Sequence, residues 1–170
     1  MKMVILAVAA VSVLAGCVTM PPEKMPITTE QREFIFEYAA PNKSKKELFT
    51  AARNYFAMAY GNSKEVSRLE DEDQGTIIGK AIVGWRYTID EVLSMAVPCA
   101  SNYSIIFVAK DAKARLQLTL TEGIAYPMTC GWALPPKRDY PQIVESFKAI
   151  SKGLGNSIEG NSAVDKLKNF

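Results

Sequence analysis

The sequence predicts an α+β domain whose elements follow one another in the order β-α-β-β-β-β-α. Three observations predict it: residues 32–39 alternate apolar and polar side chains, residues 42–60 begin with a helix-start signal, and a second amphipathic pattern follows Asp139. Alternation with period two is typical of a strand buried on one face, whereas spacings of three and four are typical of a helix. A chain of 170 residues suits one domain with a single core.

The first strand and the first helix have the clearest patterns. The strand divides its side chains between two faces, with Phe34, Phe36 and Tyr38 on one and Glu33, Ile35 and Glu37 on the other. In the helix over residues 42–60, Ser44 is the expected N-cap, and Glu47 three residues later completes a capping box. The helix is expected to end at Gly61.

A hairpin is predicted between residues 65–69 and 76–86, joined by a polar turn over residues 70–75. The acidic side chains of this turn suggest a calcium loop, but its glycine comes one position too early and the closing glutamate is missing. We therefore interpret it as a solvated turn. The run Gly75–Lys80 is similar to a phosphate-binding loop, yet it is one residue too short and is followed by Ala81 instead of Ser or Thr.

A second hairpin is predicted from residues 103–109 and 113–124 with a turn at 110–112, because leucines alternate with polar residues along its second strand. The preceding segment, residues 87–100, fits either a helical face or a further strand. We favour a strand followed by a loop. A proline-rich loop over residues 126–138 comes after the hairpin, and its tryptophan, Trp132, is expected to cap the core.

The second helix is predicted to start after this loop. Asp139 and Gln142 form a capping-box candidate, and Pro141 suits the first helical turn. The helix is expected to end at Gly153 or Gly155. Beyond it, residues 156–170 read as a polar tail, within which residues 163–170 could form a short helix.

The start of the chain resembles the signal of bacterial lipoproteins. Lys2 provides a cationic start, residues 4–14 form an apolar run, and Leu14-Ala15-Gly16-Cys17 matches the lipobox at all four positions. The apolar run is shorter than the roughly 20 residues of a membrane-spanning helix. The alternative is an ordinary secretory signal in which Cys17 occurs by chance.

The lipoprotein resemblance implies a diacylglycerol on the Cys17 thiol, cleavage before this residue and acylation of the new amine. Such multiple acyl chains give stable anchoring. Val18 stands where an aspartate would favour the inner membrane, so we expect the periplasmic side of the outer membrane. The chain then divides into a signal peptide over residues 1–16 and three mature segments. These are the lipidated tether over residues 17–31, the domain over residues 32–155 and the tail over residues 156–170.

The other two cysteines, Cys99 and Cys130, form an even count in an oxidising compartment once Cys17 carries lipid. A disulfide between them is the simplest interpretation. Two unpaired thiols are the alternative, because the strand register counted from the turn at Asp111 does not place them opposite each other.

The domain resembles a family of domains of unknown function with a fold like that of the TATA-binding protein. The resemblance is carried by Phe36-x12-Phe49, by the helix start Ser44-Lys45-Lys46-Glu47-Leu48 and by Asp73-Gln74-Gly75-Thr76-Ile77-Ile78-Gly79-Lys80. It implies a curved antiparallel sheet of about five strands with two helices packed on one face, over residues 32–155. These motifs start a helix and form a turn, so the resemblance supplies no catalytic residue.

The composition argues against several functions. The chain has no histidine, which removes imidazole-dependent nucleophile pairs and histidine zinc sites. The carboxylate pairs Glu70 with Asp73 and Asp90 with Glu91 look like exposed turn charges. A formal net charge of +2 with scattered basic residues does not suggest nucleic-acid binding. We expect no enzyme activity, no cofactor and no metal.

A sheet with helices on one face leaves the other face uncovered. Strand alternation assigns nine residues to this face: Ile35, Glu37, Ile78, Lys80, Ile82, Ile106, Val108, Gln117 and Thr119. We expect a non-catalytic module that binds an envelope protein, or a second copy, through this face. The residues 87–100 or the proline-rich loop could instead cover it. The alternative function is binding of a small ligand or lipid in a pocket lined by Trp85, Trp132 and Phe107.

Overall fold

The computed structural model describes residues 22–28, 31–61, 67–90, 92–93, 95–124 and 134–161. Several predictions fall outside these residues: the signal and lipobox, Cys130, Trp132 and the short helix over residues 163–170. They stay predictions.

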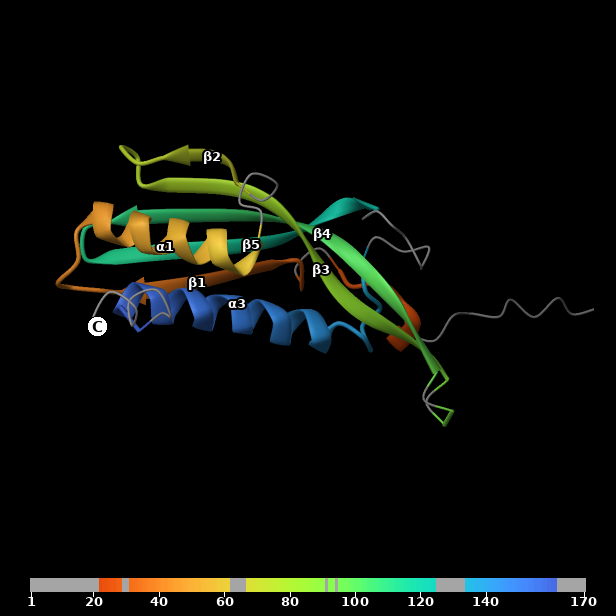
Figure 1. Ribbon diagram of the computed structural model, residues 1–170. Coiled ribbons are helices and arrows are strands. Elements are labelled where there is room, and N and C mark those ends of the chain that lie inside the picture. Colours follow the sequence, from red (N-terminus) through yellow and green to blue (C-terminus); the bar gives the residue numbers. More distant parts are fainter. Residues whose placement is uncertain are drawn as a thin grey trace, which may run out of the picture.

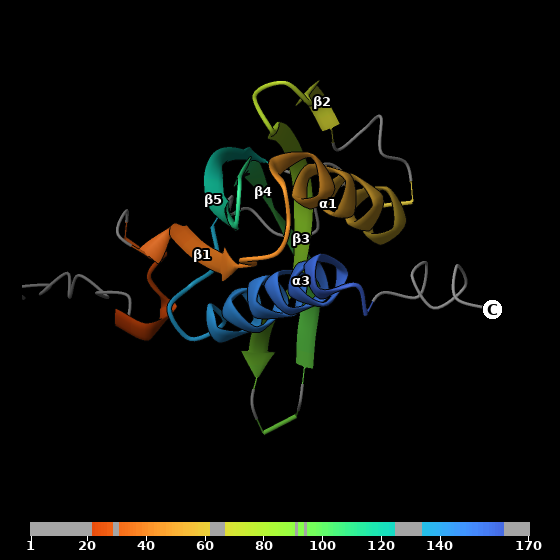
Figure 2. The same cartoon turned by 90° about the vertical axis from the view of Figure 1, so that its left-hand side faces the viewer.

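The described chain forms one five-stranded antiparallel sheet and two α-helices, with strand order β1-β5-β4-β3-β2. The elements are η1 (Pro22–Lys24, a 3-10 turn), β1 (Glu33–Ala39), α1 (Lys45–Ala59), β2 (Ser67–Asp71), β3 (Thr76–Asp90), β4 (Met95–Lys110), β5 (Lys113–Ile124) and α3 (Pro141–Glu159). Figures 1 and 2 show α1 and α3 on the same side of the curved sheet. The predicted α+β architecture is confirmed.

The core lies between this helix-covered face and the two helices. Phe147 of α3 sits at its centre, with its ring centroid 4.9 Å from those of both Phe34 and Tyr103. Phe107 of β4 is fully buried and lies edge-on to Phe56 of α1. Edge-to-face aromatic contacts of this kind add roughly 0.5–1.5 kcal/mol each to the stabilisation from area burial. The helices are therefore fixed to the sheet through aromatic side chains.

Helix α1 begins as the sequence predicts. The Ser44 hydroxyl accepts a hydrogen bond from the Glu47 backbone N–H, and the Ser44 backbone N–H donates to the Glu47 carboxylate at 2.8 Å. The hydrogen bonds from the Ser44 side chain and backbone hold the pKa of Glu47 below its ordinary value. The Lys45 N–H donates to the Asp111 carboxylate at 2.7 Å, so the hairpin turn between β4 and β5 satisfies another free amide of this helix.

The predicted strand bounds need two corrections. β2 occupies Ser67–Asp71, so it continues two residues past the predicted end at residue 69, while residues 65–66 lie outside the described residues. β3 and β4 are much longer than predicted, because the ambiguous segment 87–100 forms their outer ends, with β3 reaching Asp90 and β4 starting at Met95. The segment is thus two paired strands, where we had favoured one strand followed by a loop.

Helix α3 corrects two further expectations. Asp139 and Gln142 form no capping box, since the N-cap position is Tyr140 and no side chain caps the helix. Asp139 is instead buried, and its carboxylate accepts a hydrogen bond from the Thr88 hydroxyl at 3.2 Å. The helix does not stop at Gly153 or Gly155 but continues to Glu159.

The end of α3 is set by a different glycine. Gly160 has a φ of 80°, and its N–H bonds back to the last turn of the helix, as a left-handed C-terminal residue does. Residues 156–159, predicted as the start of a polar tail, therefore belong to the helix. Within them the buried Ser157 donates a hydrogen bond to the Ala51 carbonyl of α1 at 3.0 Å.

Gly153 is a packing residue and not a helix terminator. A Cβ atom added at this position would lie 2.7 Å from the Tyr55 ring, much closer than real Cβ contacts. The absence of a side chain at Gly153 therefore lets α1 and α3 approach each other. Gly155 is different, since a Cβ there would lie at an ordinary 3.5 Å from the Tyr38 ring.

Gly153→Ala is expected to destabilise the domain. Overpacking costs about 1–3 kcal/mol, while the higher helix propensity of alanine returns about 1 kcal/mol, which leaves a net loss of up to about 2 kcal/mol in the free energy of unfolding. Gly155→Ala is the matched control and should be neutral or slightly stabilising. Urea unfolding followed by circular dichroism measures both changes, and equal midpoints for the two variants would contradict the proposed contact.

Tyrosines that are buried or half-buried connect the helices to the sheet. The hydroxyls of Tyr60 and Tyr103 lie 2.7 Å apart, and that of Tyr38 donates to the Ser151 carbonyl at 3.1 Å. Burial raises the pKa of Tyr38, Tyr60 and Tyr103, and it raises the pKa of Tyr55 to about 12. The folded state thus holds these phenols neutral at pH values where the unfolded chain would ionise them.

The stability from these raised pKa values is present below the unfolded pKa of about 10 and is lost as the pH rises through the folded values. We expect the free energy of unfolding to fall steeply above pH of about 10, with tyrosinate absorbance rising as circular dichroism is lost. Tyr103→Phe should make this alkaline loss shallower. Full tyrosinate absorbance from a chain that keeps its circular dichroism would contradict the expectation.

Candidate interaction face and the projecting arm

We call the side of the sheet opposite the helices the open face. Strand register brings together on it the nine residues predicted from alternation. Seen end-on in Figure 2, neither α1 nor α3 lies on this side of the sheet. Glu37, Lys80 and Ile82 are exposed, whereas Val108, Gln117 and Thr119 are half-buried between their neighbours.

A row of apolar side chains crosses the open face. Ile35 of β1 pairs with Gln117 of β5, which pairs with Ile106 of β4, and the row continues through Ile78 of β3 to Leu69 of β2. We call these four apolar residues and Ile82 the apolar band. Ile35, Leu69 and Ile82 each leave about half of their surface exposed. Leu69 lies within the segment predicted as a strand, residues 65–69, but its side chain was not assigned to a face from the sequence.

Polar side chains flank the apolar band on both sides, with Arg115 and Glu37 towards the β4–β5 turn and Glu33 away from it. Arg115 forms an ion pair with Glu37 at 2.6 Å, with both side chains more than half exposed. Gln117 donates a hydrogen bond to the Glu33 carboxylate. Exposed ion pairs contribute little to stability, about 0–1 kcal/mol. The charges therefore shape the surface around the band more than they stabilise the fold.

A hollow of about 520 Å³ lies at the end of the open face near the β4–β5 turn. Its lining includes Lys110, Lys113 and Arg115, with Val108 and Glu37 beside them. Lys110 and Lys113 are register partners on either side of the β4–β5 turn. The hollow therefore presents positive charge next to an apolar wall. These cations were not singled out from the sequence, although their spacing around the turn at Asp111 was a usable signal.

The outer ends of β3 and β4 form a second surface feature. Beyond Gly84 on β3 and before Ser101 on β4, the two strands pair only with each other within the described chain. We call this ribbon, residues 84–90 and 95–100 with Val92 and Leu93 at its tip, the arm. Figure 1 shows it projecting beyond the helices.

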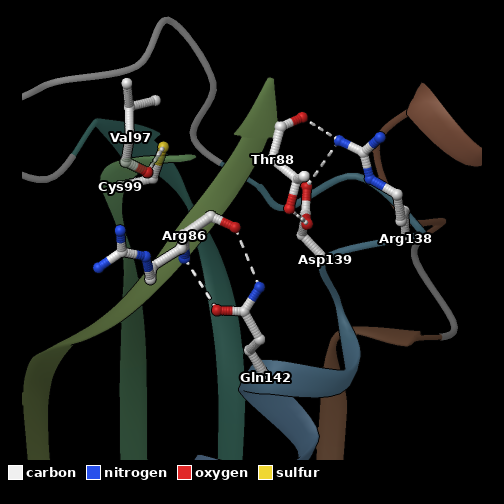
Figure 3. A network of polar contacts seen from close by, with 7 residues as sticks. All are labelled: Arg86, Thr88, Val97, Cys99, Arg138, Asp139 and Gln142. Atoms are coloured by element: carbon white, nitrogen blue, oxygen red, sulfur yellow. Dashed lines mark hydrogen bonds and ion pairs between the residues drawn. The ribbon is translucent and has the colours of Figure 1, made fainter. Parts of the chain in front are cut away.

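A polar network fixes the base of the arm (Figure 3). The Arg86 N–H donates to the Gln142 side-chain oxygen at 2.9 Å, and the Gln142 amide donates to the Arg86 carbonyl at 3.0 Å. The Arg138 guanidinium donates to the Thr88 carbonyl and lies 3.6 Å from the Asp139 carboxylate. Gln142 thus hydrogen-bonds to the β3 backbone as a neighbouring strand would. Because these contacts join residues about fifty positions apart, the capping-box prediction for Asp139 and Gln142 is wrong.

Two residues proposed for a ligand pocket lie in the core instead. Phe107 is fully buried, and Trp85 is nearly so, with its indole N–H donating to the Ser101 hydroxyl at 2.9 Å. Neither lines the hollow described above. Cys99 on β4 is buried and disulfide-bonded. Its pairing with Cys130 stays a prediction, since Cys130 lies outside the described residues.

The described residues contain no group of three or more acidic, cysteine or histidine side chains arranged to hold a metal ion. Neither α1 nor α3 has the length and apolar character that crossing a bilayer requires.

Comparison with known proteins identifies the fold. A crystal structure of a DUF4468 family protein from Bacteroides ovatus superposes with a TM-score of 0.58 at 13% identity, covering 78% of this chain and 90% of that chain. A TBP-like protein from Parabacteroides distasonis superposes with a TM-score of 0.50 at 13% identity, covering 77% and 97%. At such identities the likeness shows the fold alone. No curated protein matches the chain.

The family itself is shown by a sequence model. The model described as "Domain of unknown function (DUF4468) with TBP-like fold" matches residues 36–122, from within β1 to near the end of β5. This stretch spans more than half of the chain and contains all of the residues on which the resemblance was based. The chain belongs to the DUF4468 family of domains with a TBP-like fold.

Proposed function

We propose that the protein is a lipid-anchored module of the bacterial cell envelope that binds a partner protein, without catalysis, through its open face. The apolar band carries this proposal. Ile35, Ile78, Leu69 and Ile82 lie on one side of the sheet and expose substantial apolar surface, while α1 and α3 pack on the other side. Contiguous exposed apolar surface commonly marks a site of protein association.

The chemistry around the band fits a protein partner. Interfaces usually combine a buried apolar centre with a polar rim that supplies hydrogen bonds. Here Gln117 lies within the band, and Glu37, Arg115 and Lys80 surround it with charges of both signs. The partner would therefore present an apolar patch edged by mixed charges. An envelope protein and a second copy of this chain both meet that description.

The lipid anchor is supported by the residues at the start of the chain. Leu14-Ala15-Gly16-Cys17 matches the lipoprotein signal at every position, and Val18 favours the outer membrane. The domain begins soon afterwards, since η1 starts at Pro22. A short tether of this kind would hold the open face close to a membrane, where its partners would also be envelope proteins.

A second candidate function is favoured by the hollow at the β4–β5 turn. With about 520 Å³ and the cations Lys110, Lys113 and Arg115, it has the size of a small-molecule site and the charge for an anionic ligand. Calorimetric titration with small dicarboxylates and phosphorylated metabolites, on the wild type and on Lys110→Ala, would separate this function from protein binding.

Replacing the lipobox cysteine tests the anchor. The Cys17→Ser chain is expected to lose the lipid mass and to leave the membrane fraction, because no thiol remains to accept a diacylglycerol. Val18→Asp is a matched variant that should keep the lipid but move to the inner membrane. Intact-protein mass spectrometry and membrane fractionation read both outcomes. An unmodified Cys17 in the wild-type chain would refute the anchor.

Crosslinking in cells tests the open face. A photoreactive amino acid at Ile35 or Val108 is expected to capture a defined protein, whereas one at the exposed Lys152 of α3 should not. In the chain labelled at Val108, an added Ile35→Asp should reduce the yield about tenfold or more, since a buried charge disrupts an apolar contact. Equal yields from the open face and from Lys152 would count against the proposal.

A further inference from the structure

We infer that the tip of the arm inserts into the lipid surface to which the protein is anchored; this inference rests on the lipid anchor proposed above. The tip carries four large aliphatic side chains that solvent reaches. Val92 exposes 93% of its surface and Leu93 68%, while Ile89 and Met95 expose about half. Transfer of apolar surface of this extent from water into an apolar environment is favourable.

The arm is positioned rigidly enough for its tip to have a fixed direction. Gln142 makes two hydrogen bonds to the Arg86 backbone, and Arg138 donates to the Thr88 carbonyl. Trp85, on the core side of the arm, is almost fully buried. Among the described residues, only the part of β3 beyond Thr88 therefore extends away from the body. The Leu93 N–H donates to the Asp90 carboxylate at 2.9 Å, so this carboxylate is used within the turn.

The same residues that hold the arm also hold the start of the domain. The Arg138 N–H donates to the Glu23 carbonyl, and the Lys137 N–H donates to the Met25 carbonyl, each at 3.0 Å. Since the Arg138 side chain contacts β3, one residue links the N-terminal segment to the arm. Figure 1 accordingly shows η1 beside the base of the arm, at the end of the molecule from which the arm projects.

The length of the tether brings the membrane within reach of the tip. Four residues separate Cys17 from Pro22. Even a fully extended chain of this length spans only about 18 Å. A lipid on Cys17 would thus hold η1, and with it the base of the arm, close to the bilayer surface. When the lipid on Cys17 lies in the bilayer, the end of the domain that carries η1 and the base of the arm therefore faces the membrane.

The chemistry around the arm favours a lipid surface over a protein groove. The tip side chains are aliphatic, and the turn that carries them projects outward. Exposed cations lie near its base, including Arg86 on the arm and Lys137 beside η1. Peripheral membrane binding combines buried apolar side chains with attraction between cations and anionic headgroups. The arm would therefore act as a second, weaker contact that orients the open face.

Fluorescence quenching by lipid tests this contact. The full chain is purified from membranes and reconstituted into vesicles of phosphatidylethanolamine and phosphatidylglycerol that contain a lipid with a nitroxide on its acyl chain. A polarity-sensitive dye is attached at Leu93→Cys, with Met58→Cys on α1 as the matched control, since Met58 is similarly exposed at 55%. The unsubstituted chain measures any labelling of native cysteines.

The Leu93 label is expected to show blue-shifted emission and strong quenching, and the Met58 label neither. Ile89→Asp combined with Val92→Asp should abolish the quenching at Leu93, with unchanged circular dichroism because both residues are exposed. Two results would overturn the inference separately. A chain whose mass shows no lipid on Cys17 refutes the anchor and the orientation that follows from it. If Cys17 carries lipid but the labels at Leu93 and Met58 are quenched equally, the contact between the arm and the membrane is refuted while the anchor stands. The same holds if the tip of the arm is bound by another protein.

Discussion

The alternation of the central strand β4 decides which side of every other element is buried. β4 pairs with β3 on one side and β5 on the other, and its side chains alternate between buried and half-buried from Cys99 to Ala109. A slip of one residue in either ladder would turn the core residues of a neighbouring strand towards solvent. Because Tyr103 and Phe107 face the helices, both helices must lie on that side, and the opposite side becomes the open face.

Features that depend on neighbouring residues could be predicted from the sequence. The capping box of α1 needs only Ser44 and Glu47, and the alternation of β1 needs only the period of its own side chains. The side chains of the open face follow from the same period, which is why their common placement was predictable. Alternation says which face a residue occupies, but it does not say which strands are neighbours. The continuity of the apolar band across β2, β3, β4 and β1 therefore required the sheet order.

Features that depend on residues distant in the sequence were predicted wrongly. Gly153 has the local character of a helix terminator, yet its role is to make room for Tyr55, about a hundred residues away in the chain. Asp139 has the local character of an N-cap, yet it is buried against Thr88. The arm was ambiguous for a related reason. Ile89, Val92 and Leu93 are apolar but exposed, so their spacing reflects the surface and not a buried face.

The residues that carry the family resemblance explain why membership indicates a fold and not a partner. The helix-start motif and the turn motif meet at one corner of the domain: the Lys45 ammonium donates to the Asp73 carbonyl at 2.5 Å, and the Lys45 Cγ lies 2.9 Å from the position that a Cβ of Gly75 would take. Gly75 has a φ of +66°, and its carbonyl accepts from the Ala109 N–H at 2.8 Å.

These contacts join the start of α1, the β2–β3 turn and β4, so the motif residues that make them are scaffold, whereas Ile78 and Lys80 of the turn motif lie on the open face. Ile35 and Leu69 of the apolar band, and Val92 and Leu93 at the tip of the arm, lie outside both motifs. Their side chains face solvent, so the fold places few demands on them beyond backbone pairing. Family members that share these motif contacts can thus differ in what they bind, and binding has to be inferred from the exposed residues of each chain.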